Sequence, residues 1–309
     1  MHILVTGATG WIGSALVPQL IAAGHRVTAT TRSDTAADAV RALGAEPVRG
    51  DLRDPDSLRR AAEASGGVIH LAYRHDVAFT TDPAGAAETE YKAVTAMGEA
   101  LAGTQRPFVI AVGLAGLPEG RVAAETDHAV AHGPAGKRVE AVDHVLGLAE
   151  HGVRSAVVRL PPTVHGTGDT GFVPQLITLA RRTGQSAYVG AGDNRWPAVH
   201  RDDAATLFRL AAERAAPGTV LHAAAEEGVA FRHIAEAIAA VLGVPARSLD
   251  ADAASDHFGG FARLAGGDFP ASSTLTRERL GWTPAGPGLL AELAELAELA
   301  ELAAGDYPA

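Results

Sequence analysis

The chain has 309 residues, of which 47% are hydrophobic and 20% charged, so it can bury a large core and extensive disorder is not expected. Its formal net charge of −10, without blocks of Lys or Arg, argues against nucleic acid or an anionic membrane as a partner. The absence of cysteine excludes a disulfide framework, a thiolate nucleophile and a cysteine-ligated metal. Without a signal peptide or an apolar run of membrane-spanning length, the sequence predicts a soluble, cytoplasmic protein.

The N-terminal stretch predicts a dinucleotide site. Residues 2–5 are an apolar run typical of a strand, and a glycine-rich turn leads from them into an apolar-periodic helix. Gly7 permits a sharp turn, Gly10 lets the backbone approach a pyrophosphate, and Gly13 lets the helix lie close to the strand. The free amides at the start of that helix would bind the phosphates. The cofactor-binding residues predicted here are Gly7, Thr9, Gly10, Trp11, Ile12 and Gly13.

The end of the second predicted strand, residues 26–32, bears on the choice of cofactor. NAD enzymes usually place an acid there for the ribose hydroxyls, whereas an arginine accommodates the extra phosphate of NADP. Arg32, flanked by Thr31 and Ser33, favours NADP. Asp34 could still bind a ribose, so NAD remains the less favoured alternative.

Strands and helices then alternate along the first half of the chain. The expected strands cover residues 46–50, 68–72, 108–112 and 155–160, and the expected helices begin at Pro55 and cover 83–101 and 137–150. Residues 113–136, rich in Gly, Ala and Pro, are expected to form a loop. This alternation predicts an α/β fold with a Rossmann-type, doubly wound parallel sheet whose ligands bind at the carboxyl ends of the strands.

The second half predicts shorter elements, with helices at 173–182, 202–213 and 231–242 and a strand at 219–222. We therefore expect residues 1–165 to form the NADP-binding domain and residues 166–309 a smaller substrate lobe, partly interleaved with the sheet through about 198–225. A terminal helix of Ala-Glu-Leu repeats is expected over 287–304. Because its leucines recur every third residue, they drift around the helix, which favours docking along one part over a coiled coil.

Several segments together resemble the extended type of short-chain dehydrogenase/reductase, a superfamily of NAD(P)-dependent epimerases, dehydratases and reductases. Residues 6–13 fit its glycine motif, 51–52 its adenine contact and 70–72 its strand beside the dinucleotide, while 159–166 and 196–204 resemble two later segments. The resemblance implies a homodimer through helices 83–101 and 137–150. It also implies cofactor contacts from Asp51, Leu52, Leu71, Ala72, Tyr73, Lys137 and Pro161.

The usual catalytic residues of that superfamily are absent. A Ser is expected just after the fifth strand, where the chain has Val112-Gly113-Leu114-Ala115. A Tyr is expected four residues before a Lys, but Gly133 precedes Lys137 at that spacing and Pro134 precedes Arg138. The chain thus resembles an atypical member with an intact cofactor motif.

Three other residues are candidates for the chemistry. Tyr73 follows the fourth strand and could donate a proton, Lys137 could orient a ribose or polarise a carbonyl, and His132 could transfer protons at neutral pH. His165, past the sixth strand, is a candidate of the same kind as His132. His128 and His132 are four residues apart, but without a third ligand they predict no metal site.

The function that we predict is an NADPH-dependent oxidoreductase that reduces a small apolar carbonyl or related unsaturated substrate with a non-standard active site. The missing Ser and Tyr leave open an NADP-binding redox sensor or scaffold without turnover. A third possibility is an isomerase or epimerase that retains its cofactor. No motif identifies the substrate.

Overall fold

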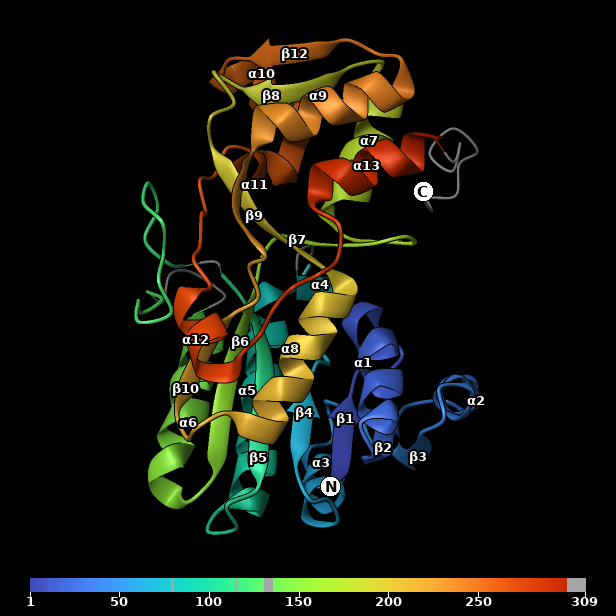
Figure 1. The fold of residues 1–309 in the computed structure, drawn as a ribbon, viewed down its shortest axis with the longest axis vertical. Coiled ribbons are helices and arrows are strands. Elements are labelled where there is room, and N and C mark those ends of the chain that lie inside the picture. Colours follow the sequence, from blue (N-terminus) through green and yellow to red (C-terminus); the bar gives the residue numbers. More distant parts are fainter. Residues whose placement is uncertain (79–80, 115, 131–135, 299–309) are drawn as a thin grey trace.

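The computed structural model describes residues 1–78, 81–114, 116–130 and 136–298. Figure 1 shows a larger α/β part that contains the N-terminus and a smaller lobe at its upper end, with the last described helix in that lobe. Long connecting segments and two strands run between the two parts. None of the helices in these described ranges is long and apolar enough to cross a membrane.

The larger part is built on a seven-stranded sheet in the order β10-β6-β5-β4-β1-β2-β3, and all its neighbouring strands are parallel. This confirms the predicted α/β, doubly wound architecture. The strand order reverses between β1 and β4, and ligands of such sheets bind at that point. The strands are β1 (His2–Thr6), β2 (Arg26–Thr31), β3 (Glu46–Arg49), β4 (Val68–His70), β5 (Pro107–Gly113), β6 (Arg154–Leu160) and β10 (Thr219–His222).

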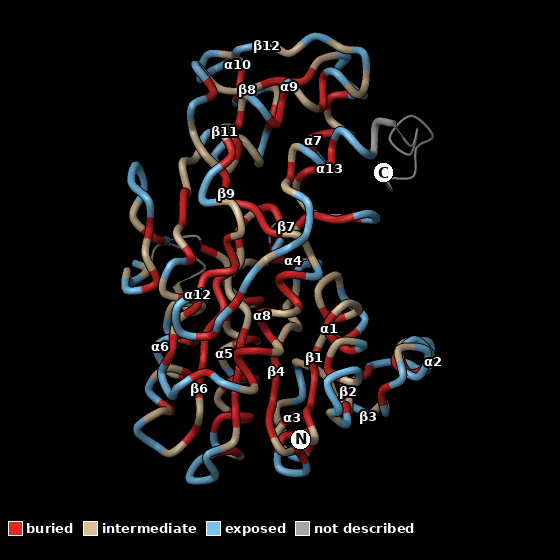
Figure 2. The backbone as a smooth tube through the Cα atoms, in the orientation of Figure 1, coloured by how far each residue is buried: buried red, intermediate tan, exposed pale blue. Residues whose placement is uncertain are grey.

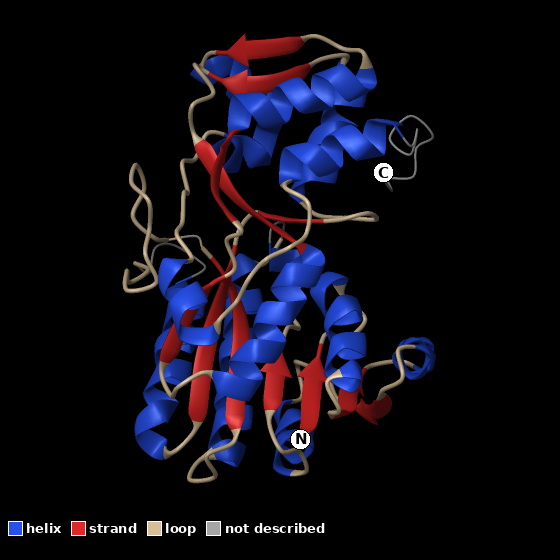
Figure 3. Cartoon of the chain, in the orientation of Figure 1, coloured by secondary structure: helices blue, strands red, loops and turns tan. Residues whose placement is uncertain are grey.

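Helices cover both faces of this sheet (Figure 3). One layer pairs α1 with α8, and the other packs α3 against α5 and α5 against α6. The helices of this part are α1 (Trp11–Ala22), α2 (Asp34–Ala42), α3 (Pro55–Glu63), the short α4 (His75–Ala78), α5 (Pro83–Leu101), α6 (Gly136–Gly147), the 3₁₀ turn Leu148–His151, α8 (Arg201–Arg214) and α12 (Thr274–Leu280).

Side-chain caps explain where several of these helices begin. Asp54 and Asp82 accept hydrogen bonds from the backbone amides of the first turns of α3 and α5, each with a proline at the start of its helix. The helix α2 was not predicted from the sequence. Its cap is Ser33, whose hydroxyl oxygen accepts a hydrogen bond of 3.1 Å from the amide of Ala36. Unlike α3, this helix has no proline at its start, and its buried residues are only the small Ala37 and Val40, so local signals for it are weak.

The smaller lobe interleaves with the sheet. The chain leaves the sheet after β6, returns with α8 and β10, leaves again at β11, returns with α12 and ends in α13. The lobe contains a three-stranded sheet in the order β11-β9-β7 and a two-stranded parallel sheet of β12 and β8. Its elements are β7 (Thr163–His165), α7 (Phe172–Thr183), β8 (Ser186–Val189), β9 (Arg195–His200), β11 (Glu226–Ala230), α9 (Phe231–Leu242), β12 (Ala246–Leu249), α10 (Ala251–Phe258), the 3₁₀ turn Gly259–Phe261, α11 (Ala262–Ala265) and α13 (Leu289–Glu298).

Separate apolar cores support the two parts. Figure 2 shows buried backbone along the strands of the sheet and a second buried region inside the smaller lobe. Clusters on the two faces of the sheet include Leu16 and Phe208 on one side and Met97 and Phe108 on the other. The lobe has its own cluster around the fully buried Trp196. Each part therefore buries apolar surface of its own.

The terminal helix docks along one face. In α13, Leu289, Glu292 and Leu293 are buried while Ala294 and Glu295 are exposed. This is the partial docking expected from leucines that drift around a helix. The remainder of the range predicted for this helix, beyond Glu298, lies outside the described residues.

Candidate active site

The glycine turn, residues 7–13, forms a backbone cradle in which side chains on Gly7 and Gly13 would collide with neighbouring backbone atoms. Gly7 has a φ of +72°, and a Cβ built on it would lie 2.8 Å from the backbone nitrogen of Ala72. A Cβ on Gly13 would lie 2.2 Å from the carbonyl oxygen of Gly7. Gly10, the residue before α1, provides no side-chain cap, so the first amides of that 12-residue helix are left for a ligand. The open cradle and free amides fit the pyrophosphate of a dinucleotide.

A buried hydrogen-bond network joins this turn to the end of β4. The hydroxyl oxygen of Thr6 accepts a bond of 3.2 Å from the amide of Ala72 and lies 2.7 Å from Nδ1 of His70. Burial, followed by the nearby Arg138 charge, lowers the pKa of His70 to about 4, so the ring is neutral. The neutral ring shares one hydrogen bond with Thr6 through Nδ1, and its other nitrogen, Nε2, is buried without a partner among the described residues.

Four arginines lie on or just after β2 and β3, and three of them have acidic partners. Arg26 pairs with Glu46, Arg49 with Asp34 and Arg53 with Asp51. In the described part of the chain, Arg32 forms neither an ion pair nor a side-chain hydrogen bond, although it is close enough to lower the pKa values of Asp51 and Asp76. The alternative ribose acid, Asp34, is held by Arg49 in the first turn of α2.

The other predicted cofactor residues differ in their surroundings. Thr9 is exposed in the turn, Ile12 packs on the core, and Trp11 donates from its ring nitrogen to the carbonyl oxygen of Val164 over 2.7 Å. The Trp11 ring also lies under the guanidinium of Arg201, 4.4 Å from the ring centre, so this side chain connects the two parts of the molecule. Leu52 packs partly against the apolar cluster that contains Met97 and Phe108. Leu71 is half-buried after β4, and Pro161 is buried after β6.

Tyr73 lies in a cluster that sequence reasoning only partly identified. The guanidinium carbon of Arg138, from α6, lies 3.8 Å from the centre of the Tyr73 ring. Nε of Arg138 donates over 2.8 Å to the carboxylate of Glu90, a residue of α5 that is 2% exposed. His75 packs edge-on against Tyr73 with 5.1 Å between the ring centres. Burial raises the pKa of Tyr73, against the opposing effect of Arg138, so its hydroxyl stays protonated at neutral pH.

The structure does not bring Lys137 to this cluster. Nζ of Lys137 bonds Glu140 over 2.6 Å and lies 4.7 Å from the centre of the Tyr91 ring. The pKa of Lys137 is raised by its hydrogen bond to Glu140, so the lysine is charged, and its side chain is exposed. Arg138, the next residue, takes the position beside Tyr73 instead. His132 lies outside the described residues.

The loop that lacks the usual Ser is held by a buried polar network. Glu125 is 3% exposed and accepts from the amide and the hydroxyl of Thr276 over 2.6 and 2.7 Å. Arg159, at the end of β6, donates to the carbonyl oxygen of Asp127 and lies 3.2 Å from His222. No local pattern predicted these bonds, because they join residues up to 151 positions apart.

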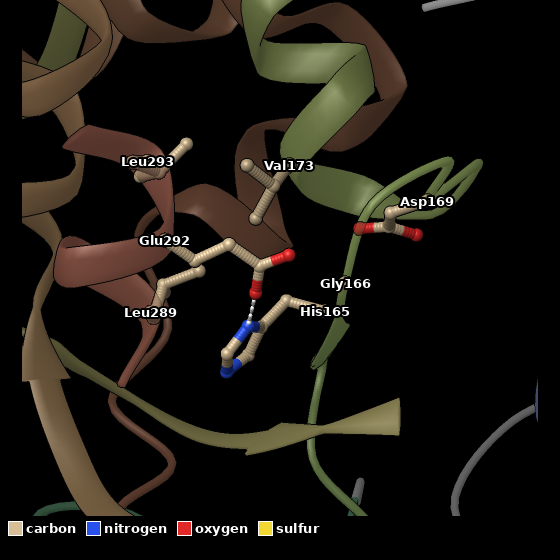
Figure 4. A pocket seen from close by; sticks show the side chains of 7 residues that line it. All are labelled: His165, Gly166, Asp169, Val173, Leu289, Glu292 and Leu293. Carbon is tan, nitrogen blue, oxygen red and sulfur yellow. Dashed lines mark hydrogen bonds and ion pairs between the residues drawn. The ribbon is translucent and has the colours of Figure 1, made fainter. Parts of the chain in front are cut away.

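A pocket in the smaller lobe contains His165. Figure 4 shows Glu292 of α13 facing Nδ1 of His165, with Val173, Leu289 and Leu293 around the carboxylate and Asp169 on the neighbouring loop. Both partners of the ion pair are buried, and Nε2 of His165 has no partner in the described chain. Burial raises the pKa of Asp169 to about 6. The structure therefore binds His165 to the lobe rather than placing it with Tyr73.

Comparison with known proteins agrees with this geometry. Residues 3–224 match the family described as the NAD dependent epimerase/dehydratase family. An uncharacterised protein of Schizosaccharomyces pombe is 42% identical over 95% of this chain and 98% of its own length. A 4-hydroxy-2-methyl-3-oxo-4-farnesyl-3,4-dihydroquinoline-1-oxide ketoreductase of Stigmatella aurantiaca is 32% identical over 71% of this chain and 67% of its own.

Solved structures show the same fold. One of them is a double mutant of the dTDP-glucose 4,6-dehydratase DesIV from Streptomyces venezuelae, determined with bound NAD. It superposes with a TM-score of 0.77 over 99% of both chains at 19% sequence identity.

Proposed function

Because the chain belongs to the NAD dependent epimerase/dehydratase family, we propose that it is an NADPH-dependent reductase of a small carbonyl compound. When bound, the reduced nicotinamide would supply hydride to the carbonyl carbon. The chain's own residues would hold the dinucleotide, select the phosphorylated cofactor and provide the proton for the oxygen. The name of the Stigmatella aurantiaca relative, a ketoreductase, supports a reductase over an epimerase.

Arg32 carries the preference for NADPH. It is the arginine after β2 and β3 that has no carboxylate partner in the described chain, and the candidate ribose acid Asp34 is held by Arg49. An unpaired guanidinium at the end of the second strand can bind a 2′-phosphate through two hydrogen bonds. Asp34, the carboxylate that could bind the ribose hydroxyls of NAD, is exposed and pairs with Arg49 at the surface, so NAD is the less favoured cofactor.

Tyr73 is the proposed proton donor. It follows β4 directly, next to Leu71 and Ala72, whose backbone lies against the glycine turn. Its hydroxyl stays protonated because burial raises its pKa. A donor beside the cofactor cradle is the group that a carbonyl oxygen needs as it gains negative charge.

Calorimetric titration with NADPH and NADH tests the cofactor assignment. We expect wild-type protein to bind NADPH more tightly than NADH, and Arg32→Ala to weaken NADPH binding by about tenfold or more while leaving NADH unchanged, since one charge-assisted contact is lost. Arg26→Ala is the matched control, because it removes an arginine of the same strand that is paired with Glu46. Equal losses in both variants would contradict the role of Arg32.

Turnover assays distinguish the reductase from a redox sensor or scaffold and from a cofactor-retaining isomerase. NADPH oxidation in the presence of a carbonyl supports the reductase. Tight NADPH binding without oxidation would favour a redox sensor or scaffold, and product formation without NADPH consumption would favour a cofactor-retaining isomerase.

We also propose a homodimer through α5 and α6, for which light scattering should give twice the mass of the chain.

A further inference from the structure

We propose that Arg138, held by Glu90, is the catalytic cation of this site and binds the oxygen of an uncharged carbonyl substrate while Tyr73 donates the proton. This proposal rests on the proposed reductase function. In this proposal, residues from three different elements replace the missing Tyr-Lys pair. They come from the segment after β4, from α5 and from α6.

The hydrogen bonds of Arg138 leave one side of its guanidinium free. Nε donates to Glu90 over 2.8 Å, and Nη2 points to the carbonyl oxygen of Ala111 at 3.5 Å. Nη1 has no partner among the described residues. Because the guanidinium is stacked on Tyr73 and tied to a carboxylate that is almost fully buried, its orientation is fixed before any substrate enters.

The reaction balances with these groups. NADPH held at the glycine turn and Arg32 would supply the hydride for the new C–H bond, and the electron pair of the broken C=O π bond would then give the oxygen its negative charge. Nη1 of Arg138 would stabilise that charge, and the Tyr73 hydroxyl would transfer its proton to give the alcohol. A proton from solvent would restore the Tyr73 hydroxyl, and the hydride given up by the cofactor would account for the two electrons gained by the carbonyl.

The charge of the pair defines the substrate class. Burial raises the pKa of Glu90, against the opposing charge and hydrogen bond of Arg138. With the Glu90 carboxylate ionised, the two side chains together carry no net charge, so the site offers a hydrogen-bond donor rather than an excess positive charge. A carboxylate substrate would be placed close to the Glu90 carboxylate without an uncompensated cation to balance it. A neutral ketone or ester-bearing ketone meets the same donor without that repulsion.

Kinetics with a matched substrate pair test the assignment. The probes are ethyl 3-oxobutanoate, which is neutral, and 3-oxobutanoate, its carboxylate. We expect Arg138→Gln to lower kcat for the neutral ester by about 100-fold, the effect of removing one preorganised donor, while NADPH affinity by calorimetry stays within about twofold of wild type. Glu90→Gln should shift the ratio of kcat/KM toward the carboxylate by about tenfold.

A control variant and two possible outcomes distinguish a catalytic role of Arg138 from a role in binding NADPH. Arg209→Gln removes an arginine paired with Glu213 on α8, outside this site, and should leave both rates unchanged. An Arg138→Gln enzyme with kcat within about threefold of wild type would overturn the proposal. An NADPH affinity that falls as far as kcat would also overturn it, because Arg138 would then be a cofactor ligand.

A spectroscopic readout decides the case in which the wild-type enzyme reduces neither probe. The charged and titratable groups that face Tyr73 are Arg138, Glu90 and His75, with His70 behind Arg138. Ultraviolet titration of tyrosinate, with Tyr73→Phe to identify the signal, should show the Tyr73 pKa raised by Arg138→Gln and lowered by Glu90→Gln. Unchanged titration in both variants would overturn the proposal. Failure of wild-type protein to bind NADPH would instead refute the reductase function itself.

Discussion

The imidazole of His165, at the end of β7, bonds the carboxylate of Glu292 on α13, 127 positions later in the chain. Both side chains are buried, and apolar residues of α7 and α13 surround the carboxylate (Figure 4). The bond attaches the last described helix to the three-stranded sheet of the smaller lobe. A polar contact in such surroundings has a large effect on stability when one partner is removed.

Glu292→Gln should therefore destabilise the protein. The amide can still bond His165, but the charge that strengthens the contact is lost, which corresponds to about 2 kcal/mol of unfolding free energy. Urea denaturation of wild type and variant measures the difference. Glu295→Gln, an exposed change in the same helix, should stay within about 0.5 kcal/mol of wild type. A Glu292 variant as stable as the Glu295 variant would show that the bond contributes little.

The buried carboxyl group of Asp169 should make the stability of the folded state fall as pH rises. Burial raises its pKa from an ordinary value of 3.8 to about 6 in the folded state, against the opposing hydrogen bond from the amide of Gly171. The folded state thus binds a proton that the unfolded state has released, so this group lowers stability as pH rises from about 4 through 6. Asp169→Asn removes that penalty and keeps the acceptor for Gly171.

We expect Asp169→Asn to be about 3 kcal/mol more stable than wild type at pH 8 and nearly equal to it below pH 4. Denaturation curves at both pH values give the comparison. A constant difference across this range would contradict the raised pKa of Asp169.

Gly13→Ala should abolish cofactor binding. Its Cβ would lie 2.2 Å from the Gly7 carbonyl oxygen, and the backbone of the cradle would have to move. Calorimetry should show the NADPH affinity reduced by about 100-fold or more. Gly147→Ala is the matched change, because a Cβ there meets nothing within 4 Å and the residue ends α6. That variant should keep normal affinity and gain about 0.5 kcal/mol of stability.

Glu125→Ala should release the loop after β5. The substitution removes the acceptor for the amide and hydroxyl of Thr276 and leaves a buried donor unpaired, at a cost of about 2–3 kcal/mol. Limited proteolysis should cut the loop sooner than in wild type. Glu119→Ala, an exposed change in the same loop, should leave the cleavage rate unaltered. Equal rates for the two variants would show that Glu125 does not hold the loop.

The sequence by itself determined the parts of this protein that depend on neighbouring residues. The glycine turn between β1 and α1, the alternation of strands and helices, and Arg32 at the end of β2 follow from local spacing. Such features are predictable because backbone geometry and apolar periodicity act over a few residues. Whether the predicted cofactor residues bind NADP remains for the titration to test.

Only the tertiary structure decided which residues join Tyr73. Lys137 and Arg138 are adjacent, yet successive side chains on a helix point about 100° apart, and the packing of α6 against α5 directs only the second toward Tyr73 and Glu90. Glu90 lies 48 positions from Arg138, and His165 lies 127 from Glu292. No sequence period encodes such contacts, because they depend on how whole helices and sheets pack.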